Sequence, residues 1–510
     1  MAHLRSRRLR ALALPAGLAL TASLGILPGA SASAAPQVSA APQVATDGPN
    51  LAYVVNTSAD HRTIASVKRE ISRAGGTVVI AYEKIGVIVV HSANPEFGKQ
   101  IRAVRGVQSA GATRTTPLNA AATTDEGSPE YISAARAAAT TSTASGVEPL
   151  EANQWDLRAI GADKAAKINP GSSKVTVGVI DTGVDDTHPD LAANFSASQS
   201  ANCVGGVADT TPGAWRPYNP AEDYHGTHVA GEIAAARNGI GVAGVAPGVK
   251  VAAIKVSDPV NGLFYPENVV CAFVFAADKG IEVTNNSYYV DPWLYNCLSD
   301  PDQKAIYDAL NRASLYAQSK GTLNVASAGN SNDDLDSNAL TDASSPDDST
   351  AVTRTVDPHK CFDVPTQLPG VVTVAAVGVQ NVKSYYSSYG KGVIDVAAPG
   401  GDKFQIPDTP DKNGRILATL PGNTYGYLQG TSMASPHVAG VAALLKSAHP
   451  WAGPLALQAL LKAEADNPGC PDKVYDSTGQ LIDATTCKGG QRVNGYNGFG
   501  IVDALDAVKK

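Results

Sequence analysis

A serine among small residues, directly before an apolar stretch, is the feature of this chain best suited to perform chemistry. Ser432 lies in the run GTSMASPHVAG, which spans residues 430–440. A serine hydroxyl is a weak nucleophile that needs a neighbouring base, a group that orients the base, and donors for the oxyanion. Backbone N–H groups at the start of a helix favour negative charge there. The sequence therefore predicts that Ser432 is a nucleophile and that Ser435 is the N-cap of the following helix.

Three segments upstream of this serine contain the side chains that it would need. Asp181 follows the apolar run 175–180, His225 begins the run HGTHVAG, and Asn330 ends the run ASAGN. An aspartate can hold one nitrogen of an imidazole, so that the other nitrogen takes the proton from a serine. An asparagine amide can donate to the oxyanion. Taken singly, these residues could be a strand-end aspartate, a turn asparagine and an N-cap serine, but their combination favours nucleophilic catalysis.

The order Asp-His-Ser along the chain resembles that of the subtilisin-like serine proteases, or subtilases, over about residues 150–510. The resemblance implies a secreted endopeptidase that hydrolyses peptide bonds through an acyl-enzyme and needs no cofactor for catalysis. The implied roles are Asp181 as the group that orients the base, His225 as the general base, Ser432 as the nucleophile and Asn330 as an oxyanion donor.

Two other histidines lie in the same motifs. His228 follows His225 by three residues on the same helix face, and His437 follows Ser432 by five residues on a helix that points it away from the nucleophile. The family pattern assigns the base to the first histidine of HGTHVAG. We therefore interpret His228 and His437 as structural residues.

Two other functions are compatible with parts of the pattern. A subtilase relative without activity could serve as a binding module, although a binding module has no need for the complete set of catalytic side chains. A serine esterase would use the same nucleophile, but the α/β-hydrolases have the order Ser-Asp-His. Both alternatives are therefore less favoured than a peptidase.

Residues that contact the substrate are implied only by the resemblance. Subtilases bind an extended peptide as an added strand, through segments that correspond here to Gly262 and Ser287, and Gly329 precedes the oxyanion asparagine. After Ser287 the family usually has a leucine and glycines, whereas this chain has tyrosines at 288 and 289 and a valine at 290. The specificity pocket therefore departs from the family pattern.

A structural calcium ion is also implied by the resemblance. Bacterial subtilisins hold calcium through segments that correspond to Asp190 and residues 238–242, and hard oxygen ligands suit this ion. The run Gly-x-Gly-x-x-Gly at 239–244 is not a dinucleotide site, because it follows a helix and lacks an acidic residue about 20 positions on. The predicted ligands are Asp190, Asn238, Ile240 and Val242, with Glu151 or Gln154 as further candidates.

Apolar strands alternate with helical patterns after residue 170, which predicts how the catalytic side chains are brought together. This alternation is typical of a mostly parallel sheet covered on both faces, so we expect the three-layer α/β fold of the subtilisins, preceded by a small α+β domain. Asp181 and Asn330 follow strand ends, and catalytic groups gather at that edge of a parallel sheet. The predicted strands are 175–180, 249–256, 281–284, 322–326, 371–377 and 393–396, and the predicted helices are 225–237, 266–279, 303–319, 435–448 and 454–463.

The residues before 151 divide into four parts. Residues 1–34 have a basic start, an apolar stretch and a small-residue cleavage site, which predicts a signal peptide for export, by the Sec or the twin-arginine route. Residues 35–49 are a linker, residues 50–118 an α+β unit with three strands and two helices, and residues 119–150 an exposed linker without a strand.

The resemblance implies roles for these parts. Residues 50–118 would be an inhibitory propeptide domain that assists folding, residues 119–150 would contain the maturation site, and residues 151–510 would be the protease domain. The alternative is that residues 50–118 are a permanent accessory domain. As a propeptide, this unit would be an intramolecular partner of the enzyme.

Composition and cysteines fit an exported globular protein. The 510 residues are 44% apolar and 17% charged, and the net charge of −7 gives no reason to expect nucleic acid or an anionic membrane as a partner. We expect a monomer whose substrates are proteins or peptides. Six cysteines suggest three disulfides among 15 possible pairings. Cys470–Cys487 would close a short polar excursion, and Cys203–Cys271 and Cys297–Cys361 follow by elimination.

Overall fold

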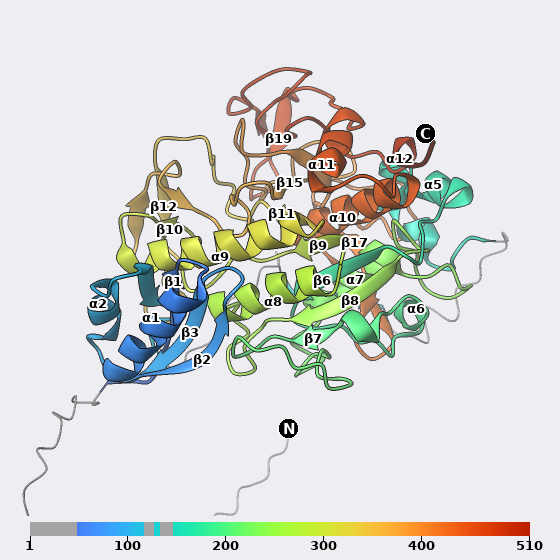
Figure 1. Ribbon diagram of the computed structural model, residues 1–510. Coiled ribbons are helices and arrows are strands. Elements are labelled where there is room, and N and C mark those ends of the chain that lie inside the picture. Colours follow the sequence, from blue (N-terminus) through green and yellow to red (C-terminus); the bar gives the residue numbers. More distant parts are fainter. Residues whose placement is uncertain (1–47, 117–126, 133–145, 510) are drawn as a thin grey trace, which may run out of the picture. The chain divides into compact units, whose positions relative to one another are not determined.

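The computed structural model describes residues 48–116, 127–132 and 146–509 (Figure 1). Its main sheet has seven parallel strands in the order β16-β15-β11-β9-β6-β8-β7. Every strand except the two-residue β7 overlaps a predicted strand. Their bounds are β6 Thr176–Asp181, β7 Ala201–Asn202, β8 Lys250–Lys255, β9 Val283–Asn286, β11 Leu323–Ser327, β15 Val372–Val377 and β16 Val396–Pro399.

Helices cover both faces of this sheet, because side chains of the central strands are apolar on both sides. In β6, Val177 and Val179 belong to one apolar core and Ile180 to the other, as the two-residue repeat of a strand requires. Each such side chain, once fully buried, contributes about 1.5–3 kcal/mol. The first core includes α7 (His225–Ala234), α10 (Thr431–Ala448) and α11 (Pro454–Ala463), and the second includes α8 (Pro266–Asp278) and α9 (Pro301–Ser319). The predicted three-layer α/β fold is confirmed.

An antiparallel sheet with the strand order β2-β3-β1-β4 forms the N-terminal α+β unit, residues 48–116. Three of its strands and both helices were predicted, but β4 was not, since its sequence VQSAGA has a single β-branched residue. The elements are β1 Leu51–Thr57, α1 His61–Arg73, β2 Gly76–Tyr82, β3 Val87–Ser92, α2 Phe97–Arg102 and β4 Val107–Ala112.

A short strand corrects the prediction that residues 119–150 contain none. β5 (Glu130–Ile132) pairs antiparallel with β18 (Thr424–Leu428), which pairs in turn with β17 (Ile416–Leu420). Ile132 is buried with Leu417 and Tyr425 in a small apolar cluster. Three residues are too few for a periodic signal, so only the pairing with β18 makes this segment a strand.

Smaller elements and three disulfides complete the described part of the chain. The disulfides join Cys203 to Cys271, Cys297 to Cys361 and Cys470 to Cys487, the same pairs that were expected. Within the described residues, no helix is both long and apolar enough to cross a membrane. The smaller elements are η1 Glu151–Asn153, α4 Trp155–Ala159, α5 Ala162–Ile168, α6 Pro189–Ala192, η2 Ala197–Gln199, β10 Asn296–Cys297, β12 Leu340–Asp342, β13 Arg354–Val356, β14 Cys361–Phe362, β19 Lys473–Tyr475, β20 Leu481–Asp483 and α12 Asp506–Lys509.

Candidate active site

Asp181 and His225 form a buried pair at the carboxyl end of β6. Asp181 is the last residue of the strand, and His225 is the first residue of α7. Nδ1 of His225 lies 2.8 and 2.9 Å from the two carboxylate oxygens of Asp181, whose side chain is fully buried. When Nδ1–H donates to this carboxylate, the imidazole is held in the tautomer whose Nε2 can accept a proton.

A glycine allows α7 to begin this close to β6. A Cβ on Gly226 would lie 2.3 Å from the carbonyl oxygen of Gly183 and 3.1 Å from Cβ of Asp181. Its backbone N–H donates to Oγ1 of Thr182, the residue after Asp181. The second position of the HGTHVAG motif therefore has to be a glycine for His225 to reach the aspartate.

Ser432 lies in the first turn of α10, and the end of β9 holds this turn. Its hydroxyl donates to the carbonyl of Ser287 (3.2 Å), while the Ser287 hydroxyl donates to the Ser432 carbonyl (2.7 Å). Since β9 pairs in register with β6, with Asn286 opposite Ile180, Ser287 follows β9 at the same edge where Asp181 ends β6. The helix that carries Ser432 also packs against the helix that carries His225.

The predicted N-cap of this helix was wrong. The helix begins at Thr431, with Gly430 as its N-cap, four residues earlier than predicted. Ser435 is an interior residue whose hydroxyl donates to Oδ1 of Asn285 (2.6 Å). Its partner lies 150 residues away in the sequence, so local sequence could not reveal that its hydroxyl was already bound.

Nδ2 of Asn330 and the backbone nitrogen of Ser432 lie near one point beside Gly430. Oδ1 of Asn330 accepts from the backbone N–H (2.9 Å) and the hydroxyl (2.8 Å) of Thr431, which fixes the orientation of the amide. A Cβ added to Gly430 would lie 3.3 Å from Nδ2 of Asn330 and 3.5 Å from the backbone nitrogen of Ser432. A glycine at 430 thus leaves room where two donors meet, as an oxyanion requires.

The other two histidines of the motifs belong to a buried charge network, formed by Asp156, His228, Glu232 and His437. Nδ1 of His228 lies 2.8 Å from Oε1 of Glu232, and its Nε2 lies 3.0 Å from the carbonyl oxygen of Gly426. Nδ1 of His437 lies 3.2 Å from Oε2 of Glu232, and its Nε2 lies 3.1 Å from Oδ2 of Asp156. Sequence analysis identified neither carboxylate, although Glu232 is four residues after His228, a spacing that brings two helix side chains together.

The charged groups around His437 give it a protonation state that differs from that of a general base. Burial by itself lowers the pKa of His437, but its interactions with the carboxylates of Asp156 and Glu232 outweigh burial and raise the pKa to about 10. An imidazole that stays protonated at neutral pH cannot accept a proton from a serine. The interpretation of His437 as structural agrees with this chemistry.

The three predicted substrate contacts differ in their distance from Ser432. Ser287 touches it directly, and the backbone N–H of Gly329 donates to the hydroxyl of Thr431, the residue before it (3.1 Å). Gly262 lies in a turn in which its N–H donates to the carbonyl of Asp258. The role of Gly262 in substrate binding stays a prediction.

The residues predicted to hold calcium surround one buried carboxylate. Asp190 accepts hydrogen bonds from the backbone N–H of Val242 (3.0 Å) and from Nδ2 of Asn238 (3.2 Å), and burial raises its pKa to about 6. Oδ1 of Asn238 accepts from the N–H of Ile240, which belongs to the same turn. The carboxylate of Asp190 is a ligand type that suits calcium, whereas the group of Asn238 that faces it is the NH2, because the amide oxygen accepts from Ile240.

Neither further candidate ligand joins this set. Both carboxylate oxygens of Glu151 bind the guanidinium of Arg237, at 2.6 and 2.8 Å, and the amide of Gln154 binds the backbone of Ala243. Within the described ranges there is also no cluster of three or more His, Cys, Asp or Glu side chains suited to a metal. Calcium at this position would therefore depend on Asp190 as the carboxylate ligand.

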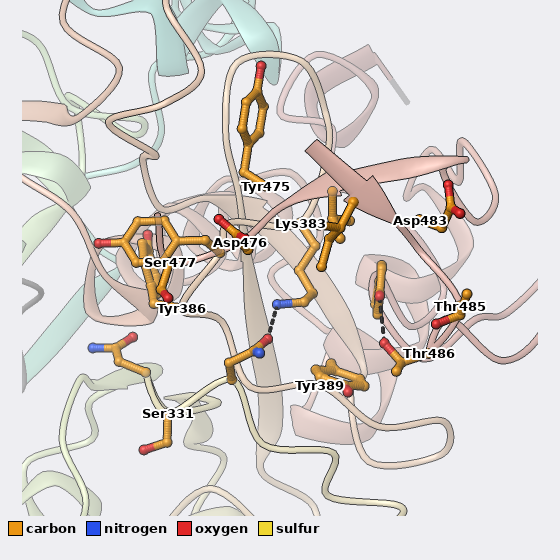
Figure 2. Close-up of a pocket in the computed structure, with 16 residues that line it drawn as sticks. Ser331, Lys383, Tyr386, Tyr389, Tyr475, Asp476, Ser477, Asp483, Thr485 and Thr486 are labelled. Carbon is orange, nitrogen blue, oxygen red and sulfur yellow. Dashed lines mark hydrogen bonds between the residues drawn. The ribbon is translucent and has the colours of Figure 1, made fainter. Parts of the chain in front are cut away.

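A cavity of about 510 Å³ opens beside Asn330, and sequence analysis did not anticipate it (Figure 2). The hairpin of β19 and β20 contributes to its wall, inside the loop closed by Cys470–Cys487. Burial lowers the pKa of Lys383 to about 7, and its Nζ donates to Oδ1 of Asn332 (2.7 Å). The lining residues include tyrosines at 385, 386, 389, 475 and 496 and hydroxyl residues at 331, 477, 485 and 486.

Comparison with known proteins places this geometry in a family. Residues 172–500 match the subtilase family, Peptidase_S8. Among curated relatives, fervidolysin of Fervidobacterium pennivorans is 33% identical over 337 residues (62% of this chain and 41% of that protein), and subtilisin E of Bacillus subtilis (strain 168) is 35% identical over 280 residues (54% and 57%). The matched part thus spans about half the length of these relatives.

Solved structures agree at the level of the fold. The epidermin leader peptide processing serine protease of Staphylococcus aureus superposes with a TM-score of 0.64 at 22% identity, covering 90% of this chain and 99% of that chain. Fervidolysin superposes with a TM-score of 0.60 at 24% identity, covering 90% and 61%. The chain belongs to the subtilase family, because the family matches most of the length of the chain and the fold agrees.

Proposed function

We propose that this protein is a secreted serine endopeptidase that hydrolyses peptide bonds through an acyl-enzyme. The observation that carries the proposal is the Asp181–His225 pair at the same sheet edge as Ser432, whose N–H faces the same space as the Asn330 amide. No cofactor is required for this chemistry.

The proposed reaction follows from these positions. Nε2 of His225 takes the proton of the Ser432 hydroxyl as Oγ bonds to the carbonyl carbon of the peptide. The oxyanion is bound by Nδ2 of Asn330 and the N–H of Ser432. The imidazolium, stabilised by Asp181, then gives its proton to the leaving amine, and water releases the acyl group by the same steps in reverse order.

A covalent probe tests the nucleophile. A fluorophosphonate should label the mature protein and should not label the Ser432→Ala variant. Ser447→Ala, at the far end of the same helix, is the matched control and should be labelled as fully as the wild type. Absence of labelling in the wild type would favour a binding module without activity. Labelled protein that cleaves p-nitrophenyl esters but not casein would favour an esterase.

We propose further that the N-terminal α+β unit is an inhibitory propeptide domain that assists folding. Polar contacts fix it to α9: Arg102 pairs with Asp302 (2.8 Å), and the Ser109 hydroxyl donates to Asp308 (2.6 Å). Residues 1–34 would direct export, and cleavage within residues 119–150 would give the mature enzyme. N-terminal sequencing of the wild type should find a mature terminus there, while Ser432→Ala should keep the whole unit if processing is autocatalytic.

A structural calcium ion beside Asp190 is part of the proposal. Burial raises the pKa of Asp190 to about 6, so the ionised carboxylate carries a desolvation cost above that pH. A bound cation would compensate this cost. Calcium should therefore raise the melting temperature at pH 8, and by less at pH 5, where protons compete for the carboxylate. Asp190→Asn should abolish the response to calcium, and an unchanged response in this variant would place the ion elsewhere.

A further inference from the structure

An arginine of the N-terminal α+β unit is held in an acidic pocket of the catalytic domain. Arg114 follows β4, and its guanidinium donates to Oε1 of Glu267 (2.5 Å). The same guanidinium lies 3.7 Å from the ring centroid of Tyr265. The side chains of Arg114 and Glu267 are only 17% and 1% exposed, so this is a buried ion pair with an aromatic floor.

The buried charge of Glu267 is compensated by the guanidinium of Arg114. It lies in the first turn of α8, and within the described residues its second carboxylate oxygen, Oε2, has no hydrogen-bond partner. A buried carboxylate that loses its cation keeps the cost of desolvation without the compensating attraction. Once the N-terminal unit has left, Glu267 would therefore favour any cationic side chain that can reach it.

Two more carboxylates make the surroundings of the pocket negative. Asp348 accepts from the backbone N–H and the hydroxyl of Thr115, at 2.6 and 2.5 Å. Asp258 adds to the negative potential that favours the charged form of Arg114. The segment 114–116 is thus held by one cationic side chain and by its own N–H and hydroxyl groups.

The pocket is joined to the candidate active site by two packed aromatic rings. Tyr265 follows Phe264, whose ring stacks on Tyr288 with the centroids 4.7 Å apart. Tyr288 follows Ser287, whose carbonyl accepts the hydrogen bond of Ser432. These contacts link Tyr265 and Glu267 to the residue whose carbonyl binds the Ser432 hydroxyl.

We propose that Glu267 and Tyr265 form a subsite for arginine in the protein substrate, several residues before the scissile bond. Arg114 occupies this subsite in the precursor. A substrate whose residues N-terminal to the scissile bond take the place of residues 114–116 would present them to the pocket. The planar guanidinium can bind the carboxylate and stack on the tyrosine at the same time, so arginine is preferred to lysine. This inference rests on the proposed peptidase function.

Peptides of one sequence can test the subsite in the mature enzyme. Internally quenched peptides carry arginine, lysine, norleucine or glutamate at each of several positions before the scissile bond, and kcat/KM is measured for each. At one position, arginine should exceed norleucine by about 10- to 100-fold, the effect of one charge-assisted hydrogen bond. Lysine should lie between them, and glutamate should be the poorest. Equal values at every position would overturn the proposal.

Variants of the pocket assign the preference to Glu267. Glu267→Gln should lower the ratio of kcat/KM for the arginine peptide to that for the norleucine peptide from about 10- to 100-fold to near one. Glu267→Asp, which keeps the charge, should restore part of the advantage. The matched control Asp506→Asn changes the net charge equally at the distant α12 and should keep the full preference. A preference that survives in Glu267→Gln would overturn the proposal.

The precursor offers a second measurement in which Glu267 is intact. Arg114→Gln should weaken the hold on the N-terminal unit, so that full activity appears sooner after processing than in the wild type. An unchanged lag would contradict the proposal, since the pocket would then contribute no binding. If the wild type neither cleaves any peptide nor reacts with a fluorophosphonate, the peptidase function itself fails, which is a different result from equal cleavage of all peptides.

Discussion

Two carboxylate–imidazole arrangements occur in this molecule, and they differ in the carboxylates that surround each imidazole. Nδ1 of His225 lies against the carboxylate of Asp181, as in an imidazole that transfers a proton through Nε2. His437 lies between two carboxylates, those of Asp156 and Glu232, and has no exposed surface. One carboxylate orients a base, whereas two carboxylates in the interior keep an imidazole charged.

The same residue types therefore serve chemistry or structure according to their surroundings. The buried charge network joins α7 to α10 and α4, so it connects the helices that carry His225 and Ser432. The Asp181–His225 pair should therefore control turnover, and the network should control stability. Substitutions that separate these two quantities test the distinction.

Removal of His225 should have the largest effect. We expect His225→Ala to lower kcat by about 10⁶, the size of the loss measured for the corresponding change in subtilisin, which is an established example for this family. The free energy of unfolding should change little by comparison. Active enzyme concentration and kcat on one peptide are the measurements. A loss below about tenfold would mean that another group acts as the base.

Removal of the charge on Glu232 should chiefly destabilise the protein. Glu232→Gln leaves a buried imidazolium with one carboxylate fewer, and breaking a buried pair costs about 3–5 kcal/mol. Urea unfolding in a Ser432→Ala background, which prevents self-digestion, measures this loss. kcat per active enzyme should stay within a few-fold of the wild type when Ser432 is present.

A half-buried carboxylate elsewhere serves as the control for this change. Glu282 accepts a hydrogen bond from the backbone N–H of Thr176 and, among the described residues, contacts no imidazole. Glu282→Gln should therefore cost far less stability than Glu232→Gln. The comparison would fail if Glu232→Gln left stability intact and lowered kcat instead.

Local patterns in the sequence predicted the central fold and indicated the four candidate catalytic side chains, because each lies at or near the end of an element with a strong apolar signal. Asp181 follows a run of valine and isoleucine, and His225 and Ser432 begin apolar helices. Elements without that signal were missed. β4 has small residues and is stabilised by pairing with β1, and β5 has three residues and exists only because it pairs with β18.

Contacts between distant side chains that no sequence motif marks could not be predicted. Asp156 and His437 are 281 residues apart, and nothing in either local sequence indicates that they meet. The start of α10 was misplaced because the hydroxyl of Ser435 binds Asn285 across the fold and so does not cap the helix. The pocket of Arg114 likewise needs Glu267, from a different part of the fold.

Substitution of Asn330, like that of His225, should lower turnover more than stability. Asn330→Leu removes the side-chain donor to the oxyanion, which in subtilisin lowers kcat by about 10²–10³. KM and the melting temperature should change little, although the side chain also accepts from Thr431. Asn330→Asp keeps this acceptor and lacks the N–H donors, so it should lose a similar part of kcat. Unchanged turnover in both variants would remove Asn330 from the site.

Loss of the charge on His437 should have the smallest effect of these changes. It should appear as a dependence of the free energy of unfolding on pH. Its pKa of about 10 lies above the ordinary value of 6.5, so its contribution to stability is complete below about pH 6.5 and is lost as pH rises through 10. Lys383, whose pKa is lowered to about 7, changes stability in the opposite direction over the same range. The difference between two proteins isolates His437, because both contain Lys383.

Ser432→Ala and the double variant Ser432→Ala/His437→Gln form that pair. From pH 7 to 10, the free energy of unfolding of the first should fall relative to that of the second, since only the first contains an imidazolium that keeps its proton in the folded state and loses it on unfolding. Parallel curves would mean that His437 carries no extra proton between Asp156 and Glu232. The two imidazole environments would then differ in geometry alone, and the charge of the network could not be the source of its stability.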